Sequence, residues 1–322
     1  MKTNSPLCWI VTEGMAGTEN QCLGIAEALN IRPVIKRIGL RQPWKFLSPW
    51  LGFEGSYSFT GDKLGPPWPD LLLASGRKSV AAARYIKKAS GGKTFAVQIQ
   101  DPRIDPACFD LVAVPAHDPA RGDNVLVTTA APNRLTQERL DAAKEQFSSL
   151  FSPLPAPRVA VLIGGSSKAH RMTPAVMEKL AAQLEPLNAG FMITASRRTD
   201  DACMDILKHA LKGRHAFIWD GTGENPYFGM LAWADYILVT EDSVSMTSEA
   251  ATTGKPVYTI PMEGGAARLD KFHEGLRKAG ITRLFNGRLE NWKYPPLQDA
   301  ERVAQAIQDR LDWPALFHEK QE

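Results

Sequence analysis

Residues 234–261 carry the pattern with the clearest chemical meaning in this sequence. They predict a buried strand, a tight turn, a helix that ends at Gly254 and a further strand. Ser243 and Ser245 stand where the helix begins, so free backbone N–H groups and the positive end of the helix dipole would attract an anion there. Glu249 follows about one and a half turns later, within reach of two ribose hydroxyls. The competing interpretation is that the serines only cap the helix and that Glu249 is a solvated surface residue.

The acidic pair Glu241 and Asp242 precedes this helix, and two carboxylates near a diphosphate would repel it. Cations elsewhere must therefore compensate, and guanidinium groups suit bidentate contacts with phosphate oxygens. Two arginines follow a predicted strand of the same half, and further basic residues follow a Gly-Gly turn. These basic candidates are Arg197, Arg198, Lys168 and Arg171. For an arginine pair in a loop, simple solvation is the competing interpretation.

Acidic residues that follow predicted strands of the first half are the candidates for a general base. Such a base takes the proton of an attacking hydroxyl group. Glu13 follows the first strand, Asp101 follows a later one, and His117 with Asp118 is a weaker third candidate. For each acidic loop residue, a solvated or capping role is the competing interpretation.

Residues 31–53 combine five basic residues with large aromatic ones and contain no acidic residue. This composition predicts a contact with a membrane interface, or a groove for an amphiphilic molecule. Prolines at 43 and 49 predict an irregular loop there. The residues that we expect at the membrane are Arg41, Trp44, Lys45, Phe46 and Trp50. The competing interpretation is a loop packed on the core, with its basic side chains reaching water.

The composition is that of a globular protein with two domains. The chain has 322 residues, of which 44% are hydrophobic and 23% charged, and single cores usually divide before this length. A net charge of +3 does not favour nucleic acid as a partner. The four cysteines form no CxxC or Cys/His cluster, which argues against a zinc site and a disulfide framework and suits the reducing cytoplasm.

Several common signatures are absent from the sequence. Residues 221–226 place Pro226 where a dinucleotide fingerprint needs its third glycine, and no Walker A pattern occurs. These absences argue against a dehydrogenase and an NTPase. No run approaches the roughly 18 apolar residues of a membrane span, and the N-terminus has too short an apolar stretch for a signal peptide. Asp200 and Asp201 are expected to cap a helix, so neither a metal nor a cofactor is predicted.

Short apolar runs alternate with Gly/Ser/Thr-rich turns and helical patterns in both halves. Strands are expected at residues 7–11, 71–74, 94–99, 111–114, 158–163, 191–194, 236–240 and 256–260. This alternation predicts an α/β fold whose parallel sheets are covered on both faces. Prolines at 153, 155 and 157 predict a stiff linker at about residues 148–157, between domains at 1–150 and 158–322. A last helix at 300–311 is expected to pack on a domain surface, in one arrangement by crossing back to the first domain.

Specific stretches of this sequence resemble known families. Residues 234–261 look like the donor-binding signature of glycosyltransferase-B enzymes, most closely that of the lipid-linked N-acetylglucosaminyl transferase of peptidoglycan synthesis. The matching elements are Ala234-Asp235, Ser248-Glu249 and Gly254-Lys255-Pro256. Over nearly the whole chain, the sequence resembles the bacterial relatives of the plant elongated-mitochondria (mitochondrial-fission) family, which includes candidate lipooligosaccharide glycosyltransferases. TEGMAGTENQC, GRKS, IQDPR, APNR, IGGSSK, SRRT and TEDSVSMTSEA carry that resemblance.

The resemblance implies two Rossmann-like domains with parallel sheets facing a central cleft, the glycosyltransferase-B type. It implies transfer of a sugar from a nucleotide-diphosphate donor to a lipid-linked or lipopolysaccharide-type glycan, with inversion and without a metal. The residues expected around the donor are Gly165, Ser166, Lys168, Arg171, Arg197, Arg198, Ser243, Ser245, Ser248 and Glu249. Those expected on the acceptor side are Gly14, Gly17, Arg77 and Arg103, with Glu13 or Asp101 as the catalytic base.

Two other functions stay open on the sequence alone. A nucleotide-sugar epimerase of the same fold would turn over the sugar nucleotide without any acceptor, and a non-catalytic scaffold for membrane division would have no nucleotide affinity. The expected partners are the donor, the lipid-linked acceptor and an anionic membrane surface, with no nucleic acid. The expected location is the cytoplasm, with the protein peripheral on the inner face of the cytoplasmic membrane.

Overall fold

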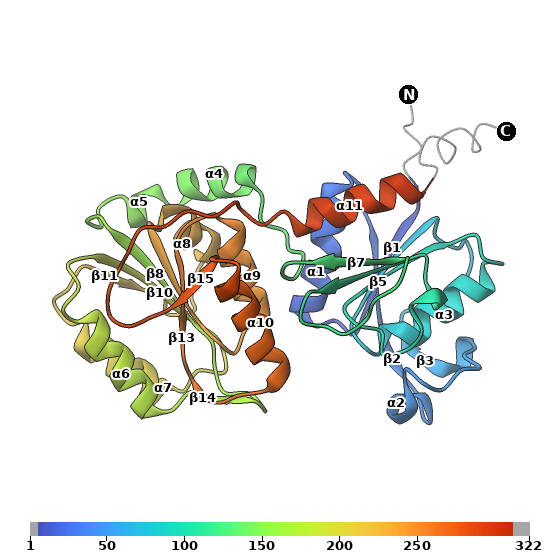
Figure 1. Cartoon of the computed structure of the whole chain (residues 1–322), viewed down its shortest axis with the longest axis horizontal. Helices are drawn as coiled ribbons and strands as arrows, with labels where there is room; N and C mark the ends of the chain where they lie inside the picture. The colour runs from blue at the N-terminus through green and yellow to red at the C-terminus, as the bar shows by residue number, and fades with distance from the viewer. Residues whose placement is uncertain (1–5, 312–322) are drawn as a thin grey trace. The chain divides into compact units, whose positions relative to one another are not determined.

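The computed structural model describes residues 6–311, which form two α/β units (Figure 1). The first unit comprises the chain up to Arg134 together with the segment from Gln298 onward, and the second comprises Leu135–Leu297. Each unit has one main sheet of parallel strands with helices on both faces, as the alternation of apolar runs and helical patterns predicts.

The sheet of the first unit has the strand order β3-β2-β1-β4-β5-β6-β7. All neighbours are parallel except β3, which is antiparallel to β2. The strands are β1 (Cys8–Thr12), β2 (Val34–Leu40), β3 (Phe59–Gly61), β4 (Leu71–Ser75), β5 (Phe95–Ile99), β6 (Leu111–Pro115) and β7 (Val125–Thr128).

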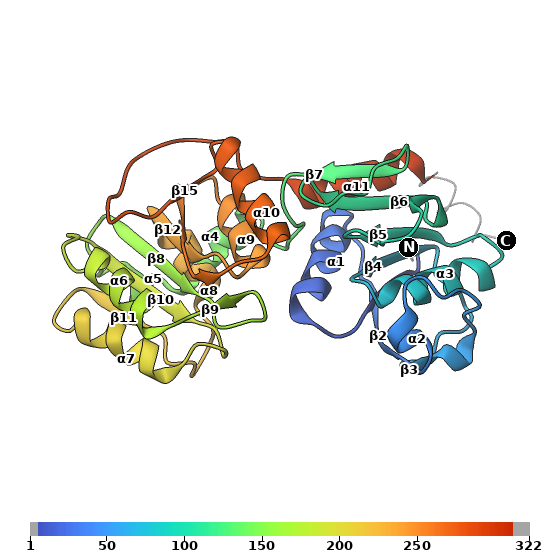
Figure 2. The same cartoon turned by 60° about the horizontal axis from the view of Figure 1, so that its bottom comes forward.

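Helices α1 (Ala16–Ala28) and α11 (Asp299–Arg310) cover one face of this sheet, and α3 (Ser79–Ala89) covers the other (Figure 2). Successive residues of β1 point to opposite faces, so Cys8 and Ile10 join the core under α1 and α11. Trp9 and Val11 join the core under α3. A short helix, α2 (Trp44–Leu47), follows β2.

The second unit has a sheet of six parallel strands in the order β11-β10-β8-β12-β13-β15. They are β8 (Arg158–Ile163), β10 (Gly190–Ala195), β11 (Ala216–Ile218), β12 (Tyr236–Thr240), β13 (Val257–Ile260) and β15 (Thr282–Leu284). Helices α6 (Pro174–Leu184) and α7 (Asp201–Ala210) cover one face, and α9 (Val244–Thr252) and α10 (Ala267–Lys278) the other (Figures 1 and 2).

Three further helices and a small ribbon complete the second unit. The helices are α4 (Gln137–Gln146), α5 (Ser148–Phe151) and α8 (Tyr227–Trp233). The ribbon joins β9 (His170–Arg171) to β14 (Glu263–Gly264) as an antiparallel pair. It therefore ties the loop after β8 to the loop after β13.

The strand order reverses beside the first strand of each sheet. In the first unit α1 and α3, which follow β1 and β4, lie on opposite faces; in the second, α6 and α9, which follow β8 and β12, do the same. Open α/β sheets bind their ligands at the carboxyl ends of the strands beside such a switch point. The fold thus brings the Glu13 loop to one switch point, and the Gly164-Gly165 and Glu241-Asp242 turns to the other.

All eight strands expected from the sequence are present, within a residue or so of the predicted bounds, whereas the predicted domain linker is wrong. The contacts place the boundary after Arg134, because α4 and α5 pack on α8 in the second unit and the Phe151 side chain in the expected linker is fully buried. The chain returns to the first unit at Gln298, and α11 packs against α1 with Val303 and Ile307 buried.

Within residues 6–311, no helix has both the length and the apolar character needed to cross a bilayer.

Candidate functional site

The carboxylate of Asp242 is the centre of a polar cluster at the carboxyl ends of β8 and β12. Its side chain is fully buried. Oδ1 accepts a hydrogen bond from the Thr240 hydroxyl at 2.7 Å, and Oδ2 accepts from the Gly165 N–H at 3.2 Å. The Arg198 guanidinium donates to Oδ2 at 3.1 Å. A buried carboxylate is tolerated only when it is paired and hydrogen-bonded in this way.

The Gly-Gly turn after β8 follows from this packing. A Cβ atom on Gly164 would lie 1.9 Å from Asp242 Oδ1, and one on Gly165 would lie 2.3 Å from the carbonyl carbon of Arg198. Any side chain at either position would displace the carboxylate or the loop after β10. The two glycines therefore allow three loops to meet at one point.

The Glu241 carboxylate also has a cationic partner within the second unit. Its Oε1 lies 3.4 Å from Nη1 of Arg277, and its backbone oxygen lies 2.8 Å from Nε2 of the buried His273. Burial lowers the pKa of His273, so the ring favours the neutral form. The expectation that Glu241 and Asp242 would face a diphosphate as free charges is corrected by these contacts.

Glu249 makes one strong hydrogen bond in a poorly hydrated place. Its Oε2 accepts from the Tyr227 hydroxyl at 2.6 Å, and Tyr227 is the first residue of α8. Burial raises the pKa of Glu249 to about 7, although the hydrogen bond from Tyr227 opposes this shift. A carboxyl group with such a pKa at a switch point is typical of a functional residue. Glu249 is therefore not the solvated surface residue of the competing interpretation.

The three serines near Glu249 have different roles. Ser243 caps α9 by accepting from the Met246 N–H at 3.2 Å, and Ser248 is buried and donates to the Val244 carbonyl at 2.7 Å. Both side chains thus serve the helix, which corrects the prediction that Ser248 contacts the donor. Ser245 is partly exposed in the first turn.

A pocket of about 630 Å³ lies at the carboxyl ends of β10 and β11. Its polar and aromatic lining consists of Ser196, Arg197, Thr199, Lys208, Trp219 and the two acidic residues Asp201 and Asp220. The Arg197 guanidinium makes no hydrogen bond or ion pair with any other described residue, whereas Arg198 is held by Asp242. An indole face together with a free guanidinium suits a flat ring attached to an anion. The sequence analysis proposed Arg197 but not Trp219, because a single tryptophan after a strand gives no distinctive signal.

The remaining donor candidates lie on the loop between β8 and α6. Ser166 accepts from the Met172 N–H at 3.1 Å, Lys168 is exposed, and Arg171 is exposed at 3.8 Å from Glu263 Oε2. Asp200 caps α7 by accepting from the Ala202 N–H, as predicted. Residues 6–311 contain no group of three His, Cys, Asp or Glu residues placed to hold a metal ion.

The first-half candidates gather at the carboxyl ends of β1, β4 and β5. Glu13 Oε2 lies 2.6 Å from the Lys78 ammonium, which follows β4 and which the sequence analysis did not single out. Gly14 has a φ of +81°, a conformation that other residues rarely adopt. Gly17 lies in the first turn of α1, and Arg77 is exposed directly after β4.

Asp101 shapes its own loop. Its Oδ1 accepts from the Arg103 N–H at 2.8 Å, and its N–H donates to the buried Asp118 carboxylate at 3.3 Å. Gln100 and Arg103 have φ values of 73° and 59°, and such strained non-glycine residues cluster at functional sites. His117 Nε2 lies 3.6 Å from Asp118. One carboxylate oxygen of each candidate base is thus engaged, that of Asp101 by its own turn and that of Glu13 by Lys78.

The basic, aromatic segment is not one irregular loop. Residues 34–40 form β2, where Lys36 lies over the Trp9 ring and Arg37 pairs with Glu19. Trp44 is partly buried against the core and donates to the Gly52 carbonyl at 3.2 Å, so its predicted place in the membrane contact is corrected.

The exposed part of this segment is smaller and more apolar than predicted. Phe46 is 73%, Trp50 62% and Phe53 86% exposed, and Arg41 and Lys45 are exposed beside them. We call residues 41–57 the aromatic loop.

Comparison with known proteins identifies the family. The profile of Mitochondrial fission ELM1 matches residues 16–311. The chain belongs to the Mitochondrial fission ELM1 family. This family member is 27% identical to Mitochondrial fission protein ELM1 of Arabidopsis thaliana, over 94% of the present chain and 90% of the plant protein. It is also 27% identical to Uncharacterized protein RP120 of Rickettsia prowazekii (strain Madrid E), over 94% of this chain and 98% of that protein.

Solved structures share the fold of this family member. A UDP-GlcNAc 2-epimerase of Methanocaldococcus jannaschii, solved with UDP-GlcNAc and UDP, aligns with a TM-score of 0.54 at 13% identity, over 94% of this chain and 99% of that one. Os79 of O. sativa, solved with U2F and trichothecene, aligns with a TM-score of 0.53 at 12% identity, over 96% and 94% of the two chains. The predicted α/β fold of the glycosyltransferase-B type is confirmed.

We expect Glu249→Gln to stabilise the folded protein at pH 8. Burial raises the folded-state pKa of Glu249 from 4.5 to about 7. The folded protein is therefore most stable with a protonated Glu249, at a pH below the unfolded-state pKa. Part of this free energy of unfolding is lost as the pH rises through the folded-state pKa and the buried carboxyl ionises. A neutral amide avoids this loss, which we put at roughly 1–3 kcal/mol. Denaturant unfolding at pH 8 and pH 5 measures the gain, which should shrink at pH 5. Glu178→Gln on the exposed side of α6 is the control, and a destabilised Glu249→Gln protein at pH 8 would contradict the prediction.

Proposed function

We propose that this protein is a glycosyltransferase that moves a sugar from a nucleoside-diphosphate donor to a lipid-linked or lipopolysaccharide-type glycan, with inversion and without a metal. The observation that carries the proposal is the half-buried Glu249 carboxyl group, which lies in the second turn of α9, the helix that follows β12 at the switch point of the second sheet. A carboxylate there can exchange its single hydrogen bond with Tyr227 for two ribose hydroxyls.

The diphosphate would lie against the start of α9 and the Arg197 side chain. The first backbone N–H groups of a helix bind anions, and Arg197 has a guanidinium that no other described residue uses. Trp219 would stack on the base in the 630 Å³ pocket. The helix start and the arginine would also stabilise the charge that develops on the leaving diphosphate, a role that in other enzymes falls to a metal ion.

Glu13 would act as the base for the acceptor hydroxyl. The Lys78 ammonium, 2.6 Å from Oε2, would hold the Glu13 carboxylate in position. As the acceptor oxygen attacks the anomeric carbon, its proton would pass to Glu13 and the bond to the diphosphate would break on the opposite side.

The aromatic loop would hold the protein on the inner face of an anionic membrane. Its exposed Phe46, Trp50 and Phe53 side chains suit the headgroup region, and Arg41 and Lys45 suit anionic lipids. A lipid-linked acceptor would reach the protein at such a surface.

We expect UDP, or another nucleoside diphosphate from a panel, to bind and to lose affinity in Glu249→Ala by roughly 1–3 kcal/mol, the effect of losing charged hydrogen bonds. Because a protonated carboxyl is a poorer acceptor, wild-type affinity should fall as the pH drops through about 7, and the affinity of Glu249→Gln should depend less on pH. Calorimetry from pH 6 to pH 8 tests both effects, with Glu178→Gln as the control. Unchanged affinity in Glu249→Ala would refute the ribose assignment, and no nucleotide affinity at all would favour a scaffold.

We expect Glu13→Gln to lower the rate of sugar transfer by about 10²–10⁴ while donor binding persists, because the amide keeps the shape of the side chain but is not a base. Asp101→Asn, made in parallel, should have the smaller effect. Release of UDP from a sugar nucleotide in the presence of lipid-linked glycans, with and without a chelator, measures the rate.

A fully active Glu13→Gln protein would exclude Glu13 as the base, and activity restored by magnesium after chelation would contradict metal-independent transfer. Epimerisation without an acceptor would favour the epimerase.

We expect the double variant Phe46→Ser, Trp50→Ser to keep its melting temperature and to lose sedimentation with anionic vesicles, because both side chains are exposed. High salt should weaken wild-type sedimentation, since screening reduces the attraction of the basic residues. Leu150→Ser with Leu284→Ser, which removes two exposed leucines of the second unit, is the matched control. A wild-type protein that ignores these vesicles at low salt would refute the membrane contact.

A further inference from the structure

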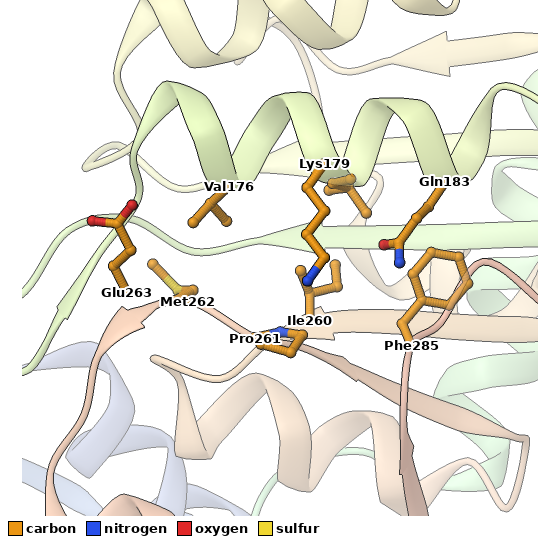
Figure 3. Close-up of a pocket in the computed structure, with 9 residues that line it drawn as sticks. Val176, Lys179, Gln183, Ile260, Pro261, Met262, Glu263 and Phe285 are labelled. Carbon is orange, nitrogen blue, oxygen red and sulfur yellow. The ribbon is translucent and has the colours of Figure 1, made fainter.

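A second pocket of the second unit shares no residue with the pocket at β10 and β11. It lies between α6 and the ends of β13 and β15 and has a volume of about 180 Å³ (Figure 3). Leu180, Ile260, Met262 and Phe285 form much of its apolar wall. Because Leu180, Ile260 and Phe285 are buried core residues, the wall is built into the fold. The space is comparable to the roughly 150 Å³ of a cavity that accepts a benzene-sized molecule.

Two polar side chains of the pocket, the exposed Lys179 and the half-buried Gln183, donate to no other described residue. Lys179 and Gln183 are four residues apart on α6 and so share one face of the helix. Neither side chain makes a hydrogen bond or ion pair with another residue in the described range 6–311. In Figure 3 the Lys179 ammonium is directed toward Ile260 and Pro261, and the Gln183 amide lies beside Phe285. An ammonium and an amide N–H group together attract an anion to an otherwise apolar space.

The one acidic residue of the pocket does not cancel this attraction. Glu263 lies at the opposite end from Gln183 and Phe285 in Figure 3. Its Oε1 accepts from the Thr173 hydroxyl at 2.7 Å, and its Oε2 is 3.8 Å from the Arg171 guanidinium. The charge of Glu263 is thus engaged with groups outside the pocket, while the charge of Lys179 is not.

We propose that this pocket binds a small anionic amphiphile, with a six-carbon chain or a single ring among the apolar side chains and a carboxylate head on Lys179 and Gln183. A neutral apolar molecule would leave the ammonium unused. A sugar phosphate would bring hydroxyl groups against walls that offer them no partners.

A ligand in the pocket would also affect the loop after β8. Met262 and Glu263 belong to the segment that pairs through β14 with β9, where the Gly265 N–H donates to the Ala169 carbonyl at 2.8 Å. A ligand packed against Met262 would hold this ribbon closed and slow its local opening. This effect concerns backbone contacts alone and does not depend on the proposed function.

Hexanoate is the test ligand, with hexan-1-ol and hexylamine as probes of the same chain length. Hexanoate should raise the melting temperature of the full chain in a saturable manner, as a ligand of the folded state does, and bind more tightly than either control. Lys179→Gln should weaken hexanoate binding about tenfold, because a charge-assisted hydrogen bond is lost, while Lys212→Gln should leave it unchanged. Val176→Phe, which adds volume at the rim, should abolish binding with the circular dichroism spectrum retained.

Hydrogen exchange without any nucleotide follows the ribbon. With hexanoate present, the Gly264 and Gly265 amides should exchange more slowly, and those of α7 should not change. Equal binding of hexanoate and hexan-1-ol, or full affinity in Lys179→Gln, would overturn the anionic site. Exchange rates at Gly264 and Gly265 that ignore saturating hexanoate would overturn the effect on the ribbon.

Discussion

The buried carboxylate of Asp242 is the constraint on which the carboxyl end of the second sheet depends, because its oxygens need hydrogen-bond donors in the absence of water. Its oxygens receive donors from β12, from the turn after β8 and from the loop after β10. Each of these contacts offsets part of the cost of burying the carboxylate, so the three loops are held together at Asp242. The position of Arg197 depends on the Asp242 contact with the next residue, Arg198. The start of α9 depends on it too, since Ser243 follows Asp242 directly.

Gly254-Lys255-Pro256, which supports the resemblance to glycosyltransferase-B enzymes, affects Glu249 only indirectly, through helix α8. The Lys255 ammonium donates to the carbonyls of Leu231 and Ala232, at 2.7 and 2.6 Å, and so caps the last turn of α8. Burial lowers the pKa of Lys255 to about 8. Helix α8 begins with Tyr227, which holds the Glu249 carboxylate. The motif therefore fixes the helix that orients the candidate ribose ligand.

Local patterns in the sequence were sufficient for eight of the thirteen strands in the two main sheets of the described residues. Each expected strand is a short apolar run, and parallel strands with both faces covered require that composition. β2 was missed because it carries Lys36 and Arg37, whose side chains are satisfied by Trp9 and Glu19 from other elements. Asp242 was wrongly expected to be a free charge, because its partners Gly165 and Arg198 are distant in sequence and a local pattern does not show them. The linker was misplaced because prolines mark stiffness, whereas the boundary depends on α4 and α5 packing against α8.

The return of the chain to the first unit has a consequence for biosynthesis. Helix α11 supplies Val303, Ala304 and Ile307 to the core that covers one face of the first sheet. Asp299 at its start accepts from the Thr129 and Ala130 N–H groups at 3.0 and 2.8 Å. A ribosome produces these residues only after all of Leu135–Leu297. Domains generally fold in the order of their synthesis, but here the unit translated first leaves part of its apolar face uncovered until the later unit has emerged. The second unit, continuous in sequence, needs no segment from outside Leu135–Leu297 to complete its core.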